Sequence, residues 1–96
     1  MTTLEQLRAR REEILKLAAK RRIEDIRVFG SVIRGEDGPD SDIDMLVRAL
    51  PGCSLMGLGG FKMEMEALFG RKVDVLTDRG ISHLIRDRVM EEARPL

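Results

Sequence analysis

The chain has 96 residues, enough for one domain with a modest core, and its 17 basic and 17 acidic residues cancel to a net charge of zero. Hydrophobic residues make up 43% of the chain, and no apolar run approaches the roughly 20 residues of a membrane span. A balanced charge gives no reason to expect nucleic-acid binding by bulk electrostatics. The charged N-terminus lacks an apolar signal core and Cys53 is the one cysteine, so we expect a cytoplasmic protein with no membrane partner and no direct nucleic-acid contact.

An amphipathic helix is predicted over residues 3–21. Thr2 and Glu5 are spaced as a capping box. The apolar positions fall on one helical face: Leu4, Leu7, Ile14, Leu15 and Ala18. The basic residues of this segment are typical of a solvated helix face.

Two strands are predicted next. Ile26 and Val28 alternate with polar residues in a strand that ends at Gly30, and a helical turn over residues 32–34 follows, closed by Gly35. The aliphatic residues 43–47 predict a second strand, antiparallel to the first because the connection is short.

The second half of the chain predicts a helix, a strand and a helix. Leu58, Phe61, Met65 and Leu68 have helical spacing, but three early glycines favour a helix start nearer Phe61. The methionines of 63–66 indicate core filling rather than a metal or cofactor site. Residues 72–77 predict a third strand, and residues 82–93 predict a last helix. The whole predicts a single α/β (α+β) domain over residues 1–96, a small mixed sheet packed against helices.

The acidic segment before the second strand is the first candidate site. Asp42 and Asp44 are two residues apart, so a strand places both carboxylates on one face, while Ile43 points to the core. Neighbouring carboxylates repel, and a hard divalent cation removes that penalty. Oxygen ligands with positions left for phosphate suit Mg²⁺, and no His or Cys lies nearby to form a zinc site.

Gly30 and Ser31 lie upstream, where the first strand ends and a helical turn begins. Free backbone N–H groups, a hydroxyl and a glycine that allows close approach predict an anion pocket for a polyphosphate. Arg34 can add a positive charge there, or can be an ordinary surface arginine.

Asp74 supplies a third carboxylate. A charged residue between Val73 and Val75 is most often solvent-facing. On a neighbouring strand with the facing of Asp42 and Asp44, it is instead a candidate metal ligand and general base for an attacking hydroxyl.

These residues carry a resemblance to a known family. Gly30-Ser31, ten residues and then Asp42-Ile43-Asp44 match the GS-x10-DxD signature of the nucleotidyltransferases that resemble the palm of DNA polymerase beta. "GRKVDVLT" and "RVMEEARPL" extend the resemblance over nearly the whole chain. In its short length the chain resembles the minimal nucleotidyltransferases, which are commonly paired with HEPN-domain toxins.

The resemblance implies a Mg²⁺-dependent enzyme that transfers a nucleoside monophosphate, AMP from ATP, to a hydroxyl. It implies that Gly30 and Ser31 hold the triphosphate, that the catalytic aspartates Asp42 and Asp44 bind the metal, and that the catalytic Asp74 joins the metal site and aids the attacking oxygen. The implied acceptor is a tyrosine of a cognate HEPN ribonuclease toxin, which AMP transfer neutralises in a hetero-oligomer.

Two alternatives remain open. One is an antitoxin that neutralises its toxin by binding alone. The other is transfer to a small molecule or an RNA held by a separate subunit. A pure binder gives no physical reason to keep three repelling acids on one face, which favours the enzyme.

Overall fold

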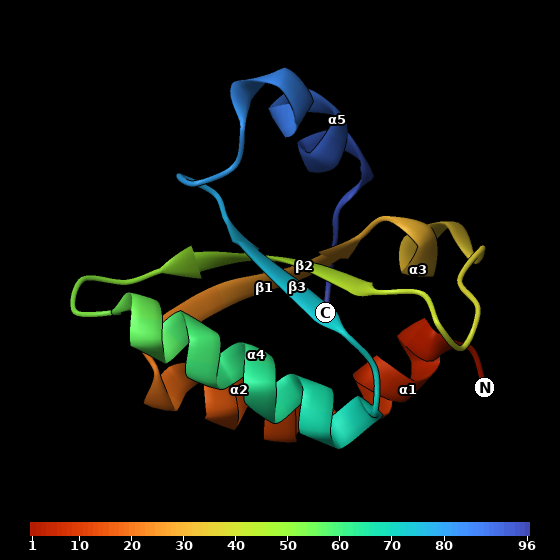
Figure 1. Ribbon diagram of the computed structural model, residues 1–96, viewed down its shortest axis with the longest axis horizontal. Coiled ribbons are helices and arrows are strands. Elements are labelled where there is room, and N and C mark those ends of the chain that lie inside the picture. Colours follow the sequence, from red (N-terminus) through yellow and green to blue (C-terminus); the bar gives the residue numbers. More distant parts are fainter.

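Four strands form one mixed sheet in a computed structural model that describes all residues, 1–96 (Figure 1). The strands are β1 (Ile23–Phe29), β2 (Ile43–Ala49), β3 (Val73–Thr77) and β4 (Arg94–Pro95). Their order across the sheet is β3-β2-β1-β4, with β2 parallel to β3 and both other pairs antiparallel. The predicted mixed sheet and the antiparallel first pair are confirmed. The two-residue strand β4 was not predicted.

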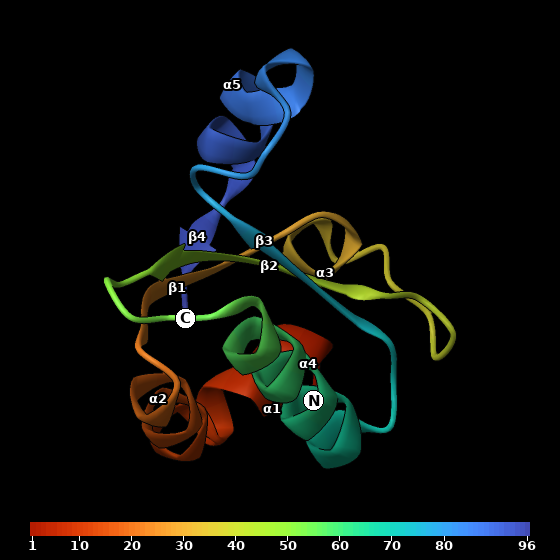
Figure 2. The ribbon, with the colours of Figure 1, turned by 60° about the vertical axis from the view of Figure 1, so that its left-hand side comes forward.

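Helices cover both faces of the sheet unequally. They are α1 (Thr3–Ala9), α2 (Arg11–Lys20), α3 (Ser31–Arg34), α4 (Leu55–Phe69) and α5 (His83–Glu92). Figures 1 and 2 show α1, α2 and α4 against one face and α5 standing on the other. None of these helices combines the length and the apolar character needed to cross a membrane.

The predicted single helix over residues 3–21 is wrong at Arg10, which leaves the helical conformation and separates α1 from α2. The Arg10 guanidinium donates to the Leu68 carbonyl oxygen at 3.2 Å and lies 5.5 Å from the centre of the Phe69 ring. These contacts with the end of α4 accompany the break, and the apolar spacing of the segment gives no sign of them. The capping box of Thr2 and Glu5 is confirmed.

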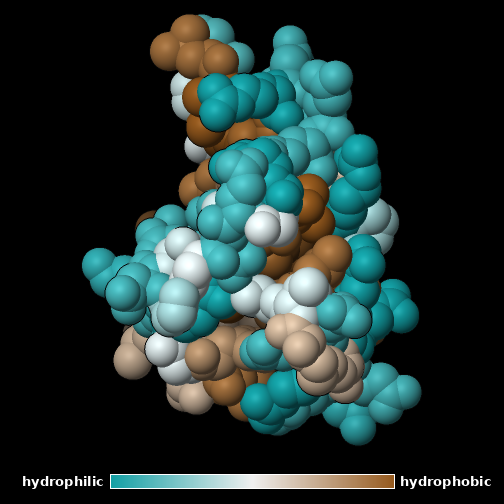
Figure 3. Space-filling view, turned by 90° about the vertical axis from the view of Figure 1, so that its right-hand side faces the viewer, coloured by the Kyte–Doolittle hydropathy of each residue, from teal (hydrophilic) through white to brown (hydrophobic).

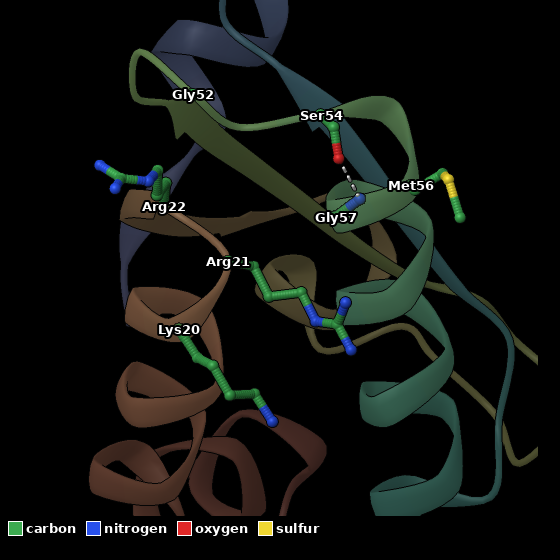
Figure 4. A pocket seen from close by; sticks show the side chains of 7 residues that line it. All are labelled: Lys20, Arg21, Arg22, Gly52, Ser54, Met56 and Gly57. Atoms are coloured by element: carbon green, nitrogen blue, oxygen red, sulfur yellow. Dashed lines mark hydrogen bonds between the residues drawn. The ribbon is translucent and has the colours of Figure 1, made fainter.

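Helix α4 begins at Leu55, so the predicted start near Phe61 is wrong. The Ser54 hydroxyl caps the helix by accepting the Gly57 N–H at 2.9 Å (Figure 4). Within the early part of the helix, Leu58 packs against the same hydrophobic cluster that contains the fully buried Phe61 and Met65, and this packing and the Ser54 cap offset the cost of the helical glycines. Core filling is confirmed for Met65, but Met63 is 70% exposed.

The strands divide their side chains between two hydrophobic clusters. Ile43, Val73 and Val75 belong to the larger cluster, under α1, α2 and α4, while Leu46 and Leu76 belong to a smaller one under α5. In Figure 3 hydrophobic side chains gather at the level of α5 and where it meets the rest of the molecule. Helix α5 covers only part of its face, and the remaining part of the sheet is left for polar side chains.

Candidate active site

Asp42 directly precedes β2 and Asp44 is its second residue, and both lie on the face that α5 leaves open. Ile43, between them, is fully buried in the larger cluster, whereas both aspartates are partly exposed. Because strand side chains alternate, the burial of Ile43 directs its two neighbours to the opposite face. The two-residue spacing predicted both carboxylates on one face and Ile43 in the core, and the structure confirms this arrangement.

Asp74 is the direct neighbour of Asp44 in the sheet. The parallel register of β2 and β3 pairs the Cα atoms of Asp44 and Asp74. Val73 and Val75 pack in the larger cluster, so Asp74 takes the other face. Asp42 and Asp74 also line one surface hollow, whose remaining lining residues are Lys62, Glu66, Gly70, Arg71 and Lys72. The structure thus brings the three predicted carboxylates to one place.

The Asp44 carboxyl carries the electrostatic cost of this crowding. Partial burial, followed by the negative charges of Asp74 and Asp42, raises its pKa from 3.8 to about 6. The positive charge of Arg34 opposes this shift, but its lowering of the Asp44 pKa is the smallest of these effects. Because burial and neighbouring negative charges disfavour the ionised form of Asp44, a bound cation or proton would stabilise the site.

Gly30 joins the turn to the carboxylates. Its φ is +76° and ψ is −153°, a conformation that only glycine adopts readily. A Cβ atom at this position would lie 2.2 Å from Asp44 Oδ2. The turn and the Asp44 carboxylate therefore touch, and no larger residue fits between them.

Ser31 and Arg34 form the short helix α3 that follows this glycine. The predicted turn over residues 32–34 is confirmed, and Gly35 closes it in the left-handed conformation. The Ser31 hydroxyl makes no hydrogen bond within the chain, which leaves it free for a ligand. Arg34 is not a free surface cation, because its guanidinium contacts both Glu36 and Glu92.

The residues fit a divalent cation that is shared with a substrate. No group of three or more His, Cys, Asp or Glu side chains is arranged closely enough to hold a metal ion by itself. The donors at the site are all carboxylate oxygens, and Asp44 and Asp74 are adjacent and repel each other. Mg²⁺ is usually held by one or two carboxylates and completed by water and substrate phosphates, so this pair suits it.

Arg71 is a site residue that the sequence analysis missed. Its guanidinium donates to the Ser41 carbonyl oxygen at 2.8 and 3.0 Å, to Thr3 Oγ1 at 2.9 Å and to Asp37 Oδ2 at 3.2 Å. Hydrogen bonds from Thr3 and then Arg71 lower the pKa of the Asp37 carboxyl. Arg71 thereby fixes the loop that delivers Asp42 and neutralises part of its acidic charge. No local pattern marks an arginine for such a distant partner.

A second hollow, drawn in Figure 4, contains none of the predicted site residues. Lys20, Arg21 and Arg22 line it together with the first turn of α4. Lys20 and Arg21 share a single partner, Glu64, so one carboxylate offsets part of the positive charge of this hollow.

Comparisons with known proteins show the family of the chain. The profile of the family described as nucleotidyltransferase domain matches residues 6–96, and the chain belongs to that family. A Methanocaldococcus jannaschii protein named as a candidate protein adenylyltransferase is 39% identical over 83 residues, which cover 86% of this chain and 89% of the relative. The protein adenylyltransferase MntA of Thermococcus cleftensis is 34% identical over 97 residues, covering 96% of this chain and 94% of the relative.

Solved structures extend the comparison. A structure described as a candidate minimal nucleotidyltransferase superposes with a TM-score of 0.85 at 45% identity, covering 97% of this chain and 95% of the other. The resemblance to minimal nucleotidyltransferases is thereby confirmed. A toxin-antitoxin structure with AMP-PNP has a TM-score of 0.73 at 22% identity, over 88% of this chain and 69% of that one, which shows a shared fold.

Proposed function

We propose that this chain is an antitoxin that transfers AMP from ATP to a hydroxyl group, a tyrosine, of a HEPN-family ribonuclease toxin and so neutralises it. The observation that carries the proposal is the placement of Asp44 beside Asp74 and against Gly30. This placement joins a polyphosphate-sized turn to a crowded carboxylate site. The nucleotidyltransferase family of the chain and its adenylyltransferase relatives support this reaction class.

Each residue has a part in the proposed transfer. The Gly30-Ser31 turn and Arg34 hold the β- and γ-phosphates, so the α-phosphorus faces the aspartates. The acceptor hydroxyl oxygen attacks the α-phosphorus, the bond from this phosphorus to the oxygen bridging to the β-phosphate breaks, and pyrophosphate leaves. Asp74, the more exposed of the paired acids, takes the hydroxyl proton.

The aspartates would also hold the cation. Asp42, Asp44 and Asp74 would bind Mg²⁺, which when bound neutralises charge on the phosphates. Such a reaction depends mainly on positioning and charge neutralisation, which a small sheet can provide.

The acceptor is proposed to arrive on another protein. The described chain packs its elements around the sheet and adds no separate lobe for an acceptor. Solved complexes with the same fold are described as toxin-antitoxin pairs of MntA and HepT. We place the pair in the cytoplasm, where ATP is available to it.

Intact-mass spectrometry tests the proposal. The purified chain is incubated with ATP, Mg²⁺ and the protein encoded by the neighbouring gene. The neighbour should gain the mass of AMP, and an Asp42→Ala, Asp44→Ala double variant should add none. No mass gain with the natural chain, together with full neutralisation by the double variant, would instead support an antitoxin that acts by binding alone.

A further inference from the structure

Glu92, the last residue of α5, contacts the turn that is proposed to bind the triphosphate. Glu92 Oε2 accepts the Gly30 N–H at 3.2 Å, and Oε1 pairs with Nη1 of Arg34. The Glu92 side chain is only 21% exposed. One carboxylate thus touches the turn at both its first backbone N–H and its arginine.

The position of Glu92 is fixed by the end of the chain. Directly after α5 the chain enters β4, where Arg94 pairs with Val28 of β1. The Leu96 N–H then donates to the Ile26 carbonyl oxygen at 3.0 Å, and the Leu96 side chain is buried in the larger cluster. Because Gly30 directly follows β1, these contacts hold Glu92 and Gly30 in one rigid frame.

Arg34 is held at two of its three guanidinium nitrogens. Nη1 contacts Glu92, Nε donates to Glu36 Oε1 at 3.1 Å, and Nη2 has no partner within the chain. The guanidinium is a planar fork, so fixing two nitrogens also fixes the direction of the third. An exposed arginine without these contacts would lose side-chain entropy on binding a phosphate.

We propose that Glu92 is a positioning residue for the nucleotide: it fixes the Gly30 N–H and aims the free Nη2 of Arg34 at the triphosphate. This inference rests on the proposed function. Glu92 acts through Arg34 and the turn, and it does not touch the reacting atoms.

A different role for the same contacts predicts an effect of opposite sign. If Glu92 simply filled an anion pocket, the triphosphate would have to displace it, and removing its charge would tighten nucleotide binding. If Glu92 positions Arg34, removing its charge weakens binding even though a negative group near the phosphates has been lost. The direction of the change therefore decides between the two roles.

Calorimetric titration with a non-hydrolysable ATP analogue and Mg²⁺ makes this measurement without requiring catalysis. Glu92→Gln keeps the shape of the side chain, and Glu91→Gln on the exposed neighbour is the matched control. We expect Glu92→Gln to raise the Kd about tenfold. This is the lower end of the loss that follows when the hydrogen-bond partner that orients a ligand-binding residue is removed. Glu91→Gln should leave the Kd unchanged.

The dependence on Arg34 separates positioning from a merely structural role. In an Arg34→Ala background the effect of Glu92→Gln on the Kd should become much smaller, because the guanidinium it orients is gone. Thermal unfolding of each variant verifies that it is folded at the titration temperature. If Glu92→Gln does not fold, Glu92→Asp, too short to span both partners, should raise the Kd in its place.

The results that would overturn the positioning role differ from those that would overturn the proposed function. An unchanged or lowered Kd in folded Glu92→Gln, or an undiminished loss in the Arg34→Ala background, would overturn the positioning role alone. A natural chain that binds no nucleotide would overturn the proposed function and this inference with it.

Discussion

Asp44 occupies a position where burial and two neighbouring charges all oppose its ionisation. Its pKa is raised to about 6 by burial, by Asp74 and by Asp42. Such crowding is costly for folding alone, since an asparagine of the same shape would avoid it. The carboxylate at this position therefore indicates a use in the chemistry of the site.

The raised pKa predicts how stability depends on pH. The folded state holds the Asp44 proton up to about pH 6, while the unfolded chain releases it near 3.8, so this group's stabilisation is present below pH 4 and lost as the pH rises through 6. Asp44→Asn should match the natural chain in stability near pH 4. At pH 8 it should be more stable by about 1 kcal/mol, a value reduced for the partial exposure of Asp44.

Urea unfolding at pH 4, 6 and 8 measures this difference, with Asp40→Asn in the exposed loop as the control. Groups such as Asp25 and Asp37, whose pKa values are lowered by hydrogen bonds, stabilise the fold as the pH rises, but they are shared by both chains and cancel. If the stability curves of Asp44→Asn and the natural chain run parallel from pH 4 to pH 8, the electrostatic account of Asp44 is wrong.

Gly30 provides a second prediction at the residue scale. Gly30→Ala places a Cβ atom 2.2 Å from Asp44 Oδ2 at a φ of +76°, so it should cost about 3 kcal/mol or more of unfolding free energy and abolish nucleotide binding. Gly35→Ala is the control, because Gly35 also has a positive φ but has no atom within 4 Å, and it should cost only about 1 kcal/mol. Equal losses in the two variants would contradict the contact between Gly30 and Asp44.

The sequence predicted much of the site because its residues are spaced within two short segments. Gly30, Ser31, Asp42 and Asp44 are recognisable from the turn and the two-residue strand period. Glu92 was not recognisable, since its partners Gly30 and Arg34 lie about sixty residues earlier and meet it only through the pairing of β4 with β1.

At the element scale, α4 shows how tertiary burial overrides local preference. Its glycines predicted a late start, but the packing of Leu58 against the larger cluster and the Ser54 cap accompany a helix that begins at Leu55. Similarly, the apolar spacing of residues 3–21 predicted one helix, while the contacts of Arg10 with the end of α4 accompany a break. Element types followed from periodicity, and element ends depended on distant partners.

Two glycines of α4 make a matched pair of variants. Gly59→Ala adds a methyl group into open space and should raise the unfolding free energy by about 0.5–1 kcal/mol through helix propensity. Gly60→Ala would place its Cβ 2.4 Å from Arg21 Nη1, so the Arg21–Glu64 ion pair must shift and the gain should disappear. Thermal unfolding compares the two, and an equal gain in both would show that Arg21 does not lie across α4.

At the scale of the whole molecule, the C-terminus ties the two sides of the sheet together. Leu96 is buried under the sheet in the larger cluster, while α5, a few residues earlier, covers the opposite face. The order of helices and strands predicted from periodicity was sufficient to predict a sheet packed against helices. It could not supply the β2–β3 register that places Asp44 beside Asp74, because register depends on packing across the sheet.

Leu96→Ala tests this connection. The loss of a buried leucine should cost about 2–4 kcal/mol, and it should also weaken nucleotide binding by loosening Glu92. Leu84→Ala, on a side chain that is 82% exposed, should change stability by less than about 0.5 kcal/mol. Denaturant unfolding and nucleotide titration measure both quantities, and full nucleotide affinity in a folded Leu96→Ala chain would argue against the link.

The central claim is that the crowded aspartates exist for nucleotidyl transfer, and the most direct measurement of it is the transfer rate of Asp44→Asn. ATP labelled on the α-phosphate reports transfer of AMP to the proposed toxin partner, and ATP labelled on the γ-phosphate serves as the control for phosphorylation. The account predicts that the natural chain transfers only the α-label, and that the more stable Asp44→Asn chain transfers none. Transfer of the α-label by folded Asp44→Asn at the natural rate would contradict it.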